Sequence, residues 1–487
     1  MAAPLYTTDS GRLYHAGQIL LAFVGLPARG KTHVSRSVER YLRWLGVKIE
    51  GAHPYHTINI MSVRLTAALP TVFSLGDHRR RVLGPSAKLP KDYFYTEGRC
   101  AETEQLRSLV KDSLETEIIS FFNQRNGQVA IYDANNSKRS MRIGIRQRFE
   151  KIGVSVIFIE NICDRADIVE SNIRSVKISS PDYAGWDQEK AVADYLSRIA
   201  QHERHYETLR PEIGAYVKIY NVGERLVVNN VRGYLQSRIV FYLMNVHHKK
   251  RTIWFARSGQ SLIEHSYKAD ADLSPQGIEY AENLRDFIVS KRAELLQERV
   301  KAGERATERR LTIWTSARNR CLSTCRPLQE IGYKVIERQQ MYELNPGVID
   351  GMEPDEIQKM FPDEFKAHQV APYSHRYPRA ESYHDLSVRL EPVILELERE
   401  PADILFIGHA SVIRCVMAYL QVHTRAHSTD HLALGADVSA FPRFVQGLTP
   451  QEIPNVELRR GDVVQVSPSS CEWSHIRFKL AWFELLI

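Results

Sequence analysis

A glycine-rich segment near the start of the chain carries the residues with the clearest chemical meaning. It reads Gly25-Leu26-Pro27-Ala28-Arg29-Gly30-Lys31-Thr32 and fits the pattern G-x-x-x-x-G-K-[ST]. In such a loop the backbone N–H groups surround an anion, the lysine reaches the terminal phosphates of a nucleotide, and the hydroxyl binds magnesium. We therefore predict that residues 25–32 bind ATP, with Lys31 on its phosphates and Thr32 on Mg²⁺.

The flanking residues supply the strand and the helix that this loop requires. Residues 19–24 are an apolar run typical of a buried strand, and the apolar residues of 33–45 recur at helical spacing. The loop then lies at the N-terminus of a helix, whose positive end favours a phosphate group. Strand, loop and helix together make the motif a specific prediction of a nucleotide site.

Two further residues of the amino-terminal half could act on a transferring phosphoryl group. Asp133 ends the apolar run 128–132, where P-loop proteins place a carboxylate near magnesium. It could coordinate the ion, position the attacking hydroxyl or accept its proton; the alternative is an aspartate that caps a helix or turn. Lys177 could neutralise charge on the transferring group, although a surface lysine fits the sequence equally well.

Dispersed arginines in the same half are suited to bidentate contacts with phosphate, although composition alone would place most of them in solvent. These candidate substrate-binding residues are Arg79, Arg80, Arg107, Arg139 and Arg198.

The order of expected elements predicts two α/β domains. A chain of 487 residues is too long for one core. Strands alternate with helices in two series, over 19–220 and 252–407, which favours parallel sheets covered by helices on both faces. We place the junction near 247–251. Residues 51–71 and 423–446 interrupt the pattern, either as surface insertions or as sequence wrongly retained in a gene model.

Composition limits the partners and the compartment. The net charge of +7 is modest and forms no dense basic stripe, which argues against nucleic-acid binding. No apolar run approaches the ~20 residues of a membrane span, and the N-terminus lacks a secretory pattern. The six cysteines are scattered, as expected for reduced thiols in the cytoplasm. Cys321 and Cys325 lie four apart on an expected helix, and we expect them to pack rather than to bind metal.

Five segments of the amino-terminal half resemble the 6-phosphofructo-2-kinase/fructose-2,6-bisphosphatase family, with the character of its fungal members. They are residues 25–32, 41–46, 127–134, 176–183 and 237–245. The resemblance covers nearly the whole chain apart from the two interruptions and the termini. It implies a P-loop kinase domain over 1–246, with the insertion 51–71, and a phosphoglycerate-mutase-like histidine-phosphatase domain over 252–487, with the insertion 423–446. It also suggests a homodimer.

The resemblance further implies a reaction. The γ-phosphoryl group of ATP would pass to the C2 hydroxyl of fructose 6-phosphate and give fructose 2,6-bisphosphate, an activator of glycolysis. Lys31, Asp133 and Lys177 would be the catalytic residues, and the arginines would bind the sugar phosphate. Two positions depart from the family: Asn135 stands in place of a usual threonine, and His202 in place of a common tyrosine. Either change could alter substrate affinity without removing catalysis.

The carboxy-terminal half departs from the family at its nucleophile. Histidine phosphatases carry an Arg-His-Gly signature after the first strand, and the chain reads Arg257-Ser258-Gly259. A serine hydroxyl is a poor nucleophile unless a base activates it. The matched positions are Arg257, Arg320 and His409 for the phosphate, Glu343 as proton donor, and Tyr383 and Arg414 for the other phosphate of the sugar.

Other substrate contacts of this half have changed as well. The family's arginine and lysine before residue 376 appear as His368 and Pro372, and the glutamine after its second histidine appears as Ala410. We predict a pocket that binds phosphate esters without cleaving them and leaves the chain a net kinase. The competing interpretation is a bifunctional enzyme in which His409 or a water sustains slow hydrolysis.

Two other functions remain compatible with the residues alone. One is a P-loop kinase that acts on another small hydroxyl compound or on a polynucleotide end. The other is a nucleotide-binding scaffold that binds ATP without turnover. A panel of acceptors offered with ATP separates the three.

Overall fold

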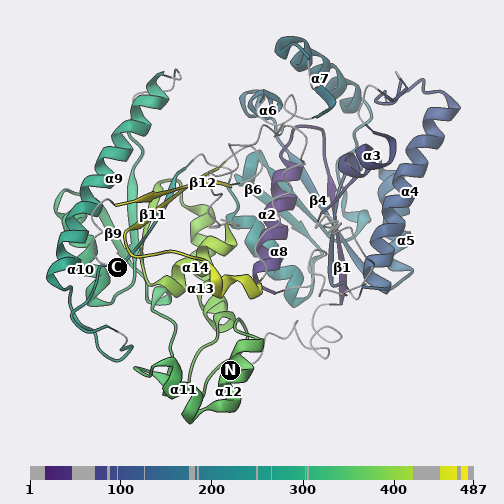
Figure 1. Cartoon of the computed structure of the whole chain (residues 1–487). Coiled ribbons are helices and arrows are strands. Elements are labelled where there is room, and N and C mark those ends of the chain that lie inside the picture. Colours follow the sequence, from purple (N-terminus) through teal and green to yellow (C-terminus); the bar gives the residue numbers. More distant parts are fainter. Residues whose placement is uncertain are drawn as a thin grey trace, which may run out of the picture. The chain divides into compact units, whose positions relative to one another are not determined.

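Two units, Met1–His248 and Lys249–Ile487, make up the computed structural model of the chain (Figure 1). The structure describes residues 17–46, 72–84, 88–90, 92–95, 97–125, 127–174, 181–183, 186–247, 251–264, 266–301, 303, 307–420, 450–468 and 473–480. The interruptions expected at 51–71 and 423–446 lie outside these residues, as does Lys177.

A six-stranded sheet forms the centre of the first unit, in the order β2-β3-β1-β4-β5-β6. Its strands are β1 (Gln18–Val24), β2 (Phe73–Ser74), β3 (Val129–Asp133), β4 (Val154–Ile162), β5 (Tyr216–Tyr220) and β6 (Arg225–Asn229). β1 to β5 pair in parallel, as predicted, but β6 is an antiparallel edge strand, so the sheet is mixed. β1 lies between β3 and β4, so the loop that follows it opens at the carboxyl edge of the sheet.

The helices of the first unit cover both faces of that sheet (Figure 1). They are α2 (Lys31–Trp44), α3 (Leu75–Leu83), α4 (Ala101–Asn123), α5 (Arg139–Glu150), α6 (Ala166–Asn172), α7 (Gln188–Glu203) and α8 (Tyr234–Asn245), with 3-10 turns at Pro181–Tyr183, Pro211–Ile213 and Asn221–Gly223. Leu20, Ala22 and Val24 of β1 pack into a core cluster with apolar residues of α4 and α5. On the helix pair α2 and α8, Tyr41 and Tyr242 stack with ring centres 4.2 Å apart.

The second unit has its own six-stranded sheet, in the order β12-β11-β7-β10-β8-β9. The strands are β7 (Ile253–Arg257), β8 (Leu311–Thr315), β9 (Lys334–Glu337), β10 (Asp403–Gly408), β11 (Asp462–Pro468) and β12 (Trp473–Lys479). β7 to β10 pair in parallel, whereas β11 and β12 are antiparallel. The carboxyl ends of β7, β10 and β8 are therefore neighbours, and the residues that follow these strands meet at one edge.

Helices of the second unit connect those strands. They are α9 (Pro275–Lys301), α10 (Asn319–Glu330), α11 (Pro354–Met360), α12 (Pro362–Val370), α13 (Tyr383–Arg399) and α14 (Ala410–Tyr419), with 3-10 turns at Gln339–Met341, Gly347–Ile349 and Pro450–Asn455. Cys321 and Cys325 are fully buried on α10, as expected of packing residues. Trp254 and Leu405 are likewise fully buried, and they join α9 and α10 in one core cluster.

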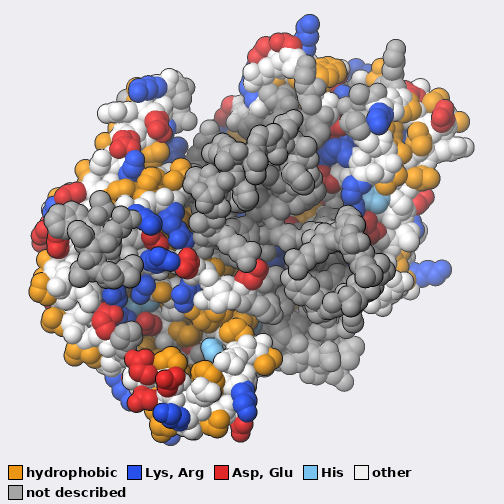
Figure 2. All heavy atoms as spheres, viewed as in Figure 1, with side chains coloured by type: hydrophobic (Ala, Val, Ile, Leu, Met, Phe, Trp, Pro, Cys, Tyr) orange, Lys and Arg blue, Asp and Glu red, His pale blue; other side chains and the backbone are white. Residues whose placement is uncertain are grey.

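The surface of each unit carries both signs of charge. Figure 2 shows acidic and basic side chains interspersed over the visible face. Within the described parts of the chain, no helix has the length and apolar character needed to cross a membrane.

Candidate functional site

The predicted phosphate loop connects β1 to α2 in the first unit. Gly25, Ala28 and Gly30 have positive φ angles of 141°, 60° and 84°. A Cβ atom at Gly25 would lie 2.6 Å from the carbonyl oxygen of Asn161. The Gly25 N–H donates to the Asn135 carbonyl at 3.0 Å, which ties the loop to the residues after β3. Backbone strain and close approach together explain why this position is a glycine.

Lys31, Thr32 and Asp133 come together at the end of the loop. The Lys31 ammonium group donates to the carbonyl oxygens of Gly25 and Leu26 at 2.9 and 2.7 Å. The Thr32 hydroxyl donates to Asp133 Oδ2 at 2.8 Å. Asp133 is not the cap of the following helix, because α5 begins after Lys138. The structure thus joins the loop cation, the hydroxyl and the carboxylate that the sequence singled out.

The Thr32–Asp133 pair has the chemistry of a magnesium site. Mg²⁺ prefers hard oxygen ligands, and in nucleotide sites it takes one or two protein oxygens together with phosphates and waters. A threonine hydroxyl and a carboxylate oxygen 2.8 Å apart, next to a phosphate loop, fit that requirement.

Four of the five candidate arginines lie beside Asp182 or beside residues 93–94. Arg79 and Arg80 of α3 both contact Asp182 Oδ2, at 2.6 and 3.2 Å. The Arg198 guanidinium lies 4.3 Å from the ring centre of Phe94, and the Arg79 guanidinium lies 5.5 Å from it. Arg107 donates to the backbone carbonyl of Tyr93, the residue before Phe94, at 2.6 Å. Arg79, Arg80, Arg107 and Arg198 are therefore the candidate residues for binding an anion, and are called the anion-binding cluster below.

Among the described residues, no contact joins Arg139 to this cluster. Its side chain is exposed at the start of α5, and its backbone N–H donates to Glu207. Sequence reasoning missed Asp182, which neutralises part of the arginine charge, and the aromatic segment at Tyr93 and Phe94. The two adjacent aromatic residues were the available signal for that segment.

His202, one of the two departures from the family, lies among cations. Burial, then the charges of Arg107, Lys31 and Arg99, lower the pKa of His202 to about 4. The imidazole is therefore neutral near pH 7. The cations that lower its pKa include Lys31 of the loop and Arg107.

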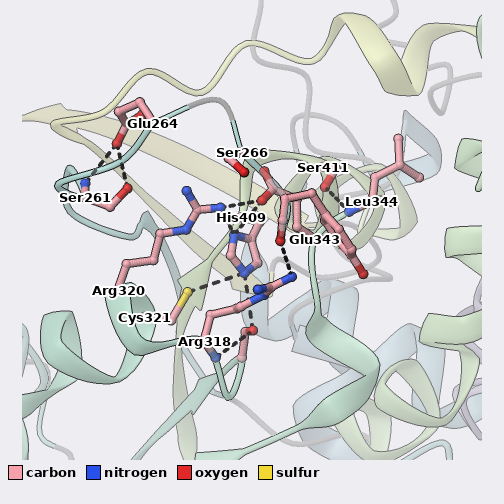
Figure 3. Close-up of polar contacts among 12 residues, drawn as sticks. Ser261, Glu264, Ser266, Arg318, Arg320, Cys321, Glu343, Leu344, His409 and Ser411 are labelled. Atoms are coloured by element: carbon pink, nitrogen blue, oxygen red, sulfur yellow. Dashed lines mark hydrogen bonds and ion pairs between the residues drawn. The ribbon is translucent and has the colours of Figure 1, made fainter. Parts of the chain in front are cut away.

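The candidate pocket of the second unit lies at the carboxyl ends of its central strands. Ser258 follows β7, Arg320 lies on the helix after β8, and His409 follows β10. In Figure 3 the side chains of Arg320, Glu343 and His409 converge. Arg320 forms an ion pair with Glu343 and approaches His409 Nδ1 at 3.0 Å. The structure thus assembles the residues predicted from three separate parts of the chain.

The hydrogen bonds of His409 fix its tautomer. Arg320 can only donate, so His409 Nδ1 is the acceptor and the ring proton is on Nε2. Nε2 faces the Ser316 hydroxyl at 3.2 Å and the Cys321 thiol at 3.6 Å. Burial, then the charges of Arg320 and Arg318, keeps the pKa of His409 well below its usual value. The imidazole is neutral, and other groups engage both of its nitrogens.

Ser258 follows β7, at the position where the sequence predicts the nucleophile, and among the described residues no contact joins its hydroxyl to an activating base. It is buried, and its N–H donates to the Gly408 carbonyl at 2.9 Å. Its hydroxyl is hydrogen-bonded to Cys321, a thiol whose pKa burial raises to about 12. A protonated thiol cannot act as a base. Both nitrogens of His409 contact other groups, Arg320 at Nδ1 and Ser316 at Nε2. Sequence reasoning had not included Cys321 in this pocket.

The remaining predicted residues line the same edge. Gly259 donates its N–H to Thr324 Oγ1 at 2.9 Å. Arg414 donates to the Tyr383 hydroxyl at 3.0 Å, which pairs the two residues expected at the second phosphate. Burial, then the charges of Arg460 and Arg414, lower the pKa of Arg257, so several guanidinium groups share this edge.

Two of the altered substrate positions carry no cation in the structure. The His368 ring packs against the ring of Tyr377, with centres 5.4 Å apart, and Ala410 is the first residue of α14.

Known protein families match both units. A model of 6-phosphofructo-2-kinase matches residues 6–53 and 57–250, and a model of the histidine phosphatase superfamily (branch 1) matches residues 253–439. Fold and matches define the class: a P-loop kinase unit followed by a unit of histidine-phosphatase fold.

Curated relatives resemble the chain over both units. A Saccharomyces cerevisiae protein named "Putative 6-phosphofructo-2-kinase/fructose-2,6-bisphosphatase YLR345W" is 36% identical over 86% of this chain and 80% of its own length. A fructose-2,6-bisphosphatase of the same yeast is 35% identical over 82% of this chain and 81% of its own length. A 6-phosphofructo-2-kinase/fructose-2,6-bisphosphatase of Aquarana catesbeiana is 35% identical over 82% of this chain and 77% of its own length. The chain belongs to the 6-phosphofructo-2-kinase/fructose-2,6-bisphosphatase family.

Proposed function

We propose that the first unit is an ATP- and Mg²⁺-dependent kinase that phosphorylates the C2 hydroxyl of fructose 6-phosphate. The observation that carries the proposal is the joining of Lys31, Thr32 and Asp133 at the end of a phosphate loop, with the Thr32–Asp133 pair at 2.8 Å. Family membership supplies the acceptor, because the relatives are named for this reaction.

The residues of the site divide the work of phosphoryl transfer. The loop N–H groups and Lys31 would hold the phosphates of ATP, and Thr32 and Asp133 would hold Mg²⁺. A bound Mg²⁺ ion, held by Thr32 and Asp133, would neutralise negative charge that develops on the phosphates. The anion-binding cluster holds the sugar phosphate and so orients the C2 hydroxyl toward the γ-phosphoryl group. Because the transition state is loose, positioned cations supply most of its stabilisation. Lys177 is proposed as one of them, and Asp133 as the residue that positions the hydroxyl or accepts its proton.

For the second unit we propose a pocket that binds phosphate esters, fructose 2,6-bisphosphate among them, without hydrolysing them. Arg257, Arg320 and Arg414 supply positive charge. Ser258 replaces the imidazole expected at the nucleophile position, and the neutral His409 is engaged at both nitrogens. Covalent catalysis needs an activated nucleophile, and the described residues show no base in contact with Ser258. Slow hydrolysis through His409 or a water is the competing proposal.

A coupled assay of ADP release tests the kinase proposal. Fructose 6-phosphate should be phosphorylated in preference to other sugar phosphates, free sugars and polynucleotide ends. Lys31→Met should abolish turnover in a folded protein, because it removes the loop cation. Lys151→Met, at an exposed lysine after α5, is the matched control and should keep turnover. Near-normal activity of Lys31→Met, or ATP binding without turnover by the unaltered chain, contradicts the proposal.

Two further properties follow from the family and from composition. We propose a cytoplasmic protein that forms a homodimer. Light scattering of the purified chain and imaging of a tagged copy test these two statements separately.

A further inference from the structure

Arg460 lies at the edge of the second-unit pocket, although neither motif nor resemblance singled it out. It is part of a tight turn before β11, in which the Asp462 N–H donates to the Arg459 carbonyl at 3.2 Å. Gly461, the third residue of this turn, has a φ of 93°, as a type II turn requires at that position. The backbone of Arg460 is therefore fixed by local turn geometry.

The strand register places this turn beside the expected nucleophile position. β11 runs antiparallel to β7, with Val463 opposite Ala256. One residue further on, β7 ends at Arg257 and β11 begins, so the turn before β11 lies next to Ser258, the residue after β7. Arg460 thus reaches the carboxyl edge of the sheet from a strand that the sequence did not predict.

Glu264, from the loop after β7, contacts Arg460 directly. Glu264 Oε2 accepts from Arg460 Nη2 at 2.9 Å, and the two side chains are 26% and 20% exposed. The other carboxylate oxygen, Oε1, accepts from the N–H and the hydroxyl of Ser261 at 2.8 and 3.1 Å (Figure 3). A carboxylate held in place by Ser261 therefore faces the guanidinium of the turn.

The ion pair leaves part of the positive charge at this edge without a partner. Arg460 Nε is buried and, among the described residues, has no hydrogen-bond partner. Buried N–H groups are nearly always paired, so this donor fits an acceptor that a bound anion would supply. Over the same described part of the chain, no hydrogen bond or ion pair engages the guanidinium of Arg257. After burial, the charge of Arg460 lowers the pKa of Arg257 more than any other charge does, which agrees with their being neighbours.

We propose that Arg460 is a ligand of a phosphate group in the second-unit pocket and that Glu264 competes with this phosphate for it. The inference rests on the proposed function of the second unit, because it assumes a pocket that takes phosphate esters. A phosphate ester carries about 1.5 to 2 negative charges at pH 7, more than one carboxylate does. A guanidinium group can donate to two of its oxygens at once. Binding exchanges one ion pair for another, and no covalent bond changes.

The test measures the affinity of the full chain for fructose 2,6-bisphosphate by calorimetry, with a non-hydrolysable ATP analogue bound to the first unit. The γ-phosphate of the analogue occupies the place that the transferred phosphate of the sugar would need there, so the titration reports the second unit. Arg460→Met should weaken binding by at least about tenfold, because it removes charge-assisted hydrogen bonds. Glu264→Gln should tighten binding by about two- to fivefold, because it removes the competing charge.

The opposite signs of these two effects distinguish a ligand from a structural contact. If the ion pair only held the loop in place, both substitutions would remove the same contact and shift the affinity in the same direction. Glutamine keeps the shape of the Glu264 side chain and can still accept from Arg460 and Ser261. The expected gain in affinity of Glu264→Gln therefore tests the proposal even if melting experiments show that Arg460→Met is destabilised.

The neighbouring ion pair supplies matched controls. Arg459 and Glu457 contact each other at 3.3 Å, and their side chains are 65% and 63% exposed. Arg459→Met and Glu457→Gln remove the same charges close by, and each should change the dissociation constant by less than about twofold at an ionic strength of about 0.15 M. At about 0.5 M salt the weakening by Arg460→Met should remain above about fivefold, because salt screens a distant charge more than a direct contact.

Two results would overturn the role of Arg460 and Glu264 while leaving the phosphate-ester pocket intact. One is a change of affinity in the same direction, or no change, in Arg460→Met and Glu264→Gln. The other is an effect of Arg460→Met that falls below about twofold at high salt, as expected of a distant charge. Failure of the unaltered chain to bind fructose 2,6-bisphosphate would remove the pocket and this inference together.

Discussion

Replacing Asp133 by asparagine separates charge from shape at the proposed magnesium site. Asparagine has nearly the same volume, and its amide oxygen can still accept the hydrogen bond that Thr32 donates at 2.8 Å. What the substitution removes is one negative charge from a side chain that is 7% exposed. The variant should therefore fold but lose kinase turnover.

The expected loss of folding stability is smaller, by several kcal/mol, than the expected loss of transition-state stabilisation. For stability, a charged hydrogen bond becomes a neutral one, a loss of about 1 kcal/mol. In a unit of this size that lowers Tm by about 2–4 °C. For catalysis, a carboxylate about 4 Å from a bound Mg²⁺ ion would contribute about 4 kcal/mol at an effective dielectric constant of about 20. That corresponds to a fall in kcat of about 10³-fold.

The assay is steady-state ADP release with fructose 6-phosphate and ATP, with thermal melting of the same samples. Asp112→Asn is the matched control, because Asp112 is exposed on α4, where it contacts Arg148 at 3.1 Å. It should keep kcat within about twofold, as expected of a surface substitution. A kcat of Asp133→Asn within tenfold of the unaltered chain would refute the assignment of Asp133 to the ion.

Two further substitutions test the loop and the second pocket. Gly25→Ala places a Cβ atom 2.6 Å from a carbonyl oxygen at a φ of 141°, so we expect a destabilisation of about 1–3 kcal/mol in melting experiments, together with loss of ATP-dependent turnover. Gly144→Ala is its control: it lies in α5 with open space around it, and should be neutral or stabilising by up to about 1 kcal/mol. Ser258→His should restore little fructose-2,6-bisphosphatase activity, because the new imidazole enters a buried position beside the Cys321 thiol while the altered sugar contacts remain; full activity in a phosphate-release assay would show that those contacts matter less than proposed.

The parts of the fold that the sequence predicted are those in which local pattern decides structure. The run 19–24, the loop and the helix after it are consecutive, and each is specified by its own residues. Residues 72–77 show the limit, because the apolar residues Val72, Phe73 and Leu75 favour a strand and only Phe73–Ser74 pair as one. The Ser74 hydroxyl accepts from the Asp77 N–H at 3.3 Å and starts α3, so a capping signal outweighed the apolar run.

The strands β6, β11 and β12 were missed for a different reason. They are antiparallel additions at the edges of otherwise parallel sheets. Edge pairing depends on which strand lies next to them in space, and the alternation of strands and helices along the chain carries no information about that.

The candidate site likewise has features that the local sequence predicts and features that depend on contacts in space. The loop, Asp133 and the pocket residues of the second unit could be predicted from motif and resemblance. The sharing of Asp182 by two arginines, the stacking of Arg198 on Phe94 and the tautomer of His409 could not, because each depends on contacts between residues far apart in the chain.

The central claim is an asymmetry between the two units, and one preparation tests it directly. Formation of fructose 2,6-bisphosphate from fructose 6-phosphate and ATP is measured beside release of phosphate from fructose 2,6-bisphosphate, with a trap for an acid-labile phosphoenzyme. We predict rapid formation, release at background level and no phosphoenzyme. Release as fast as formation, with a trapped phosphoenzyme, would contradict the account.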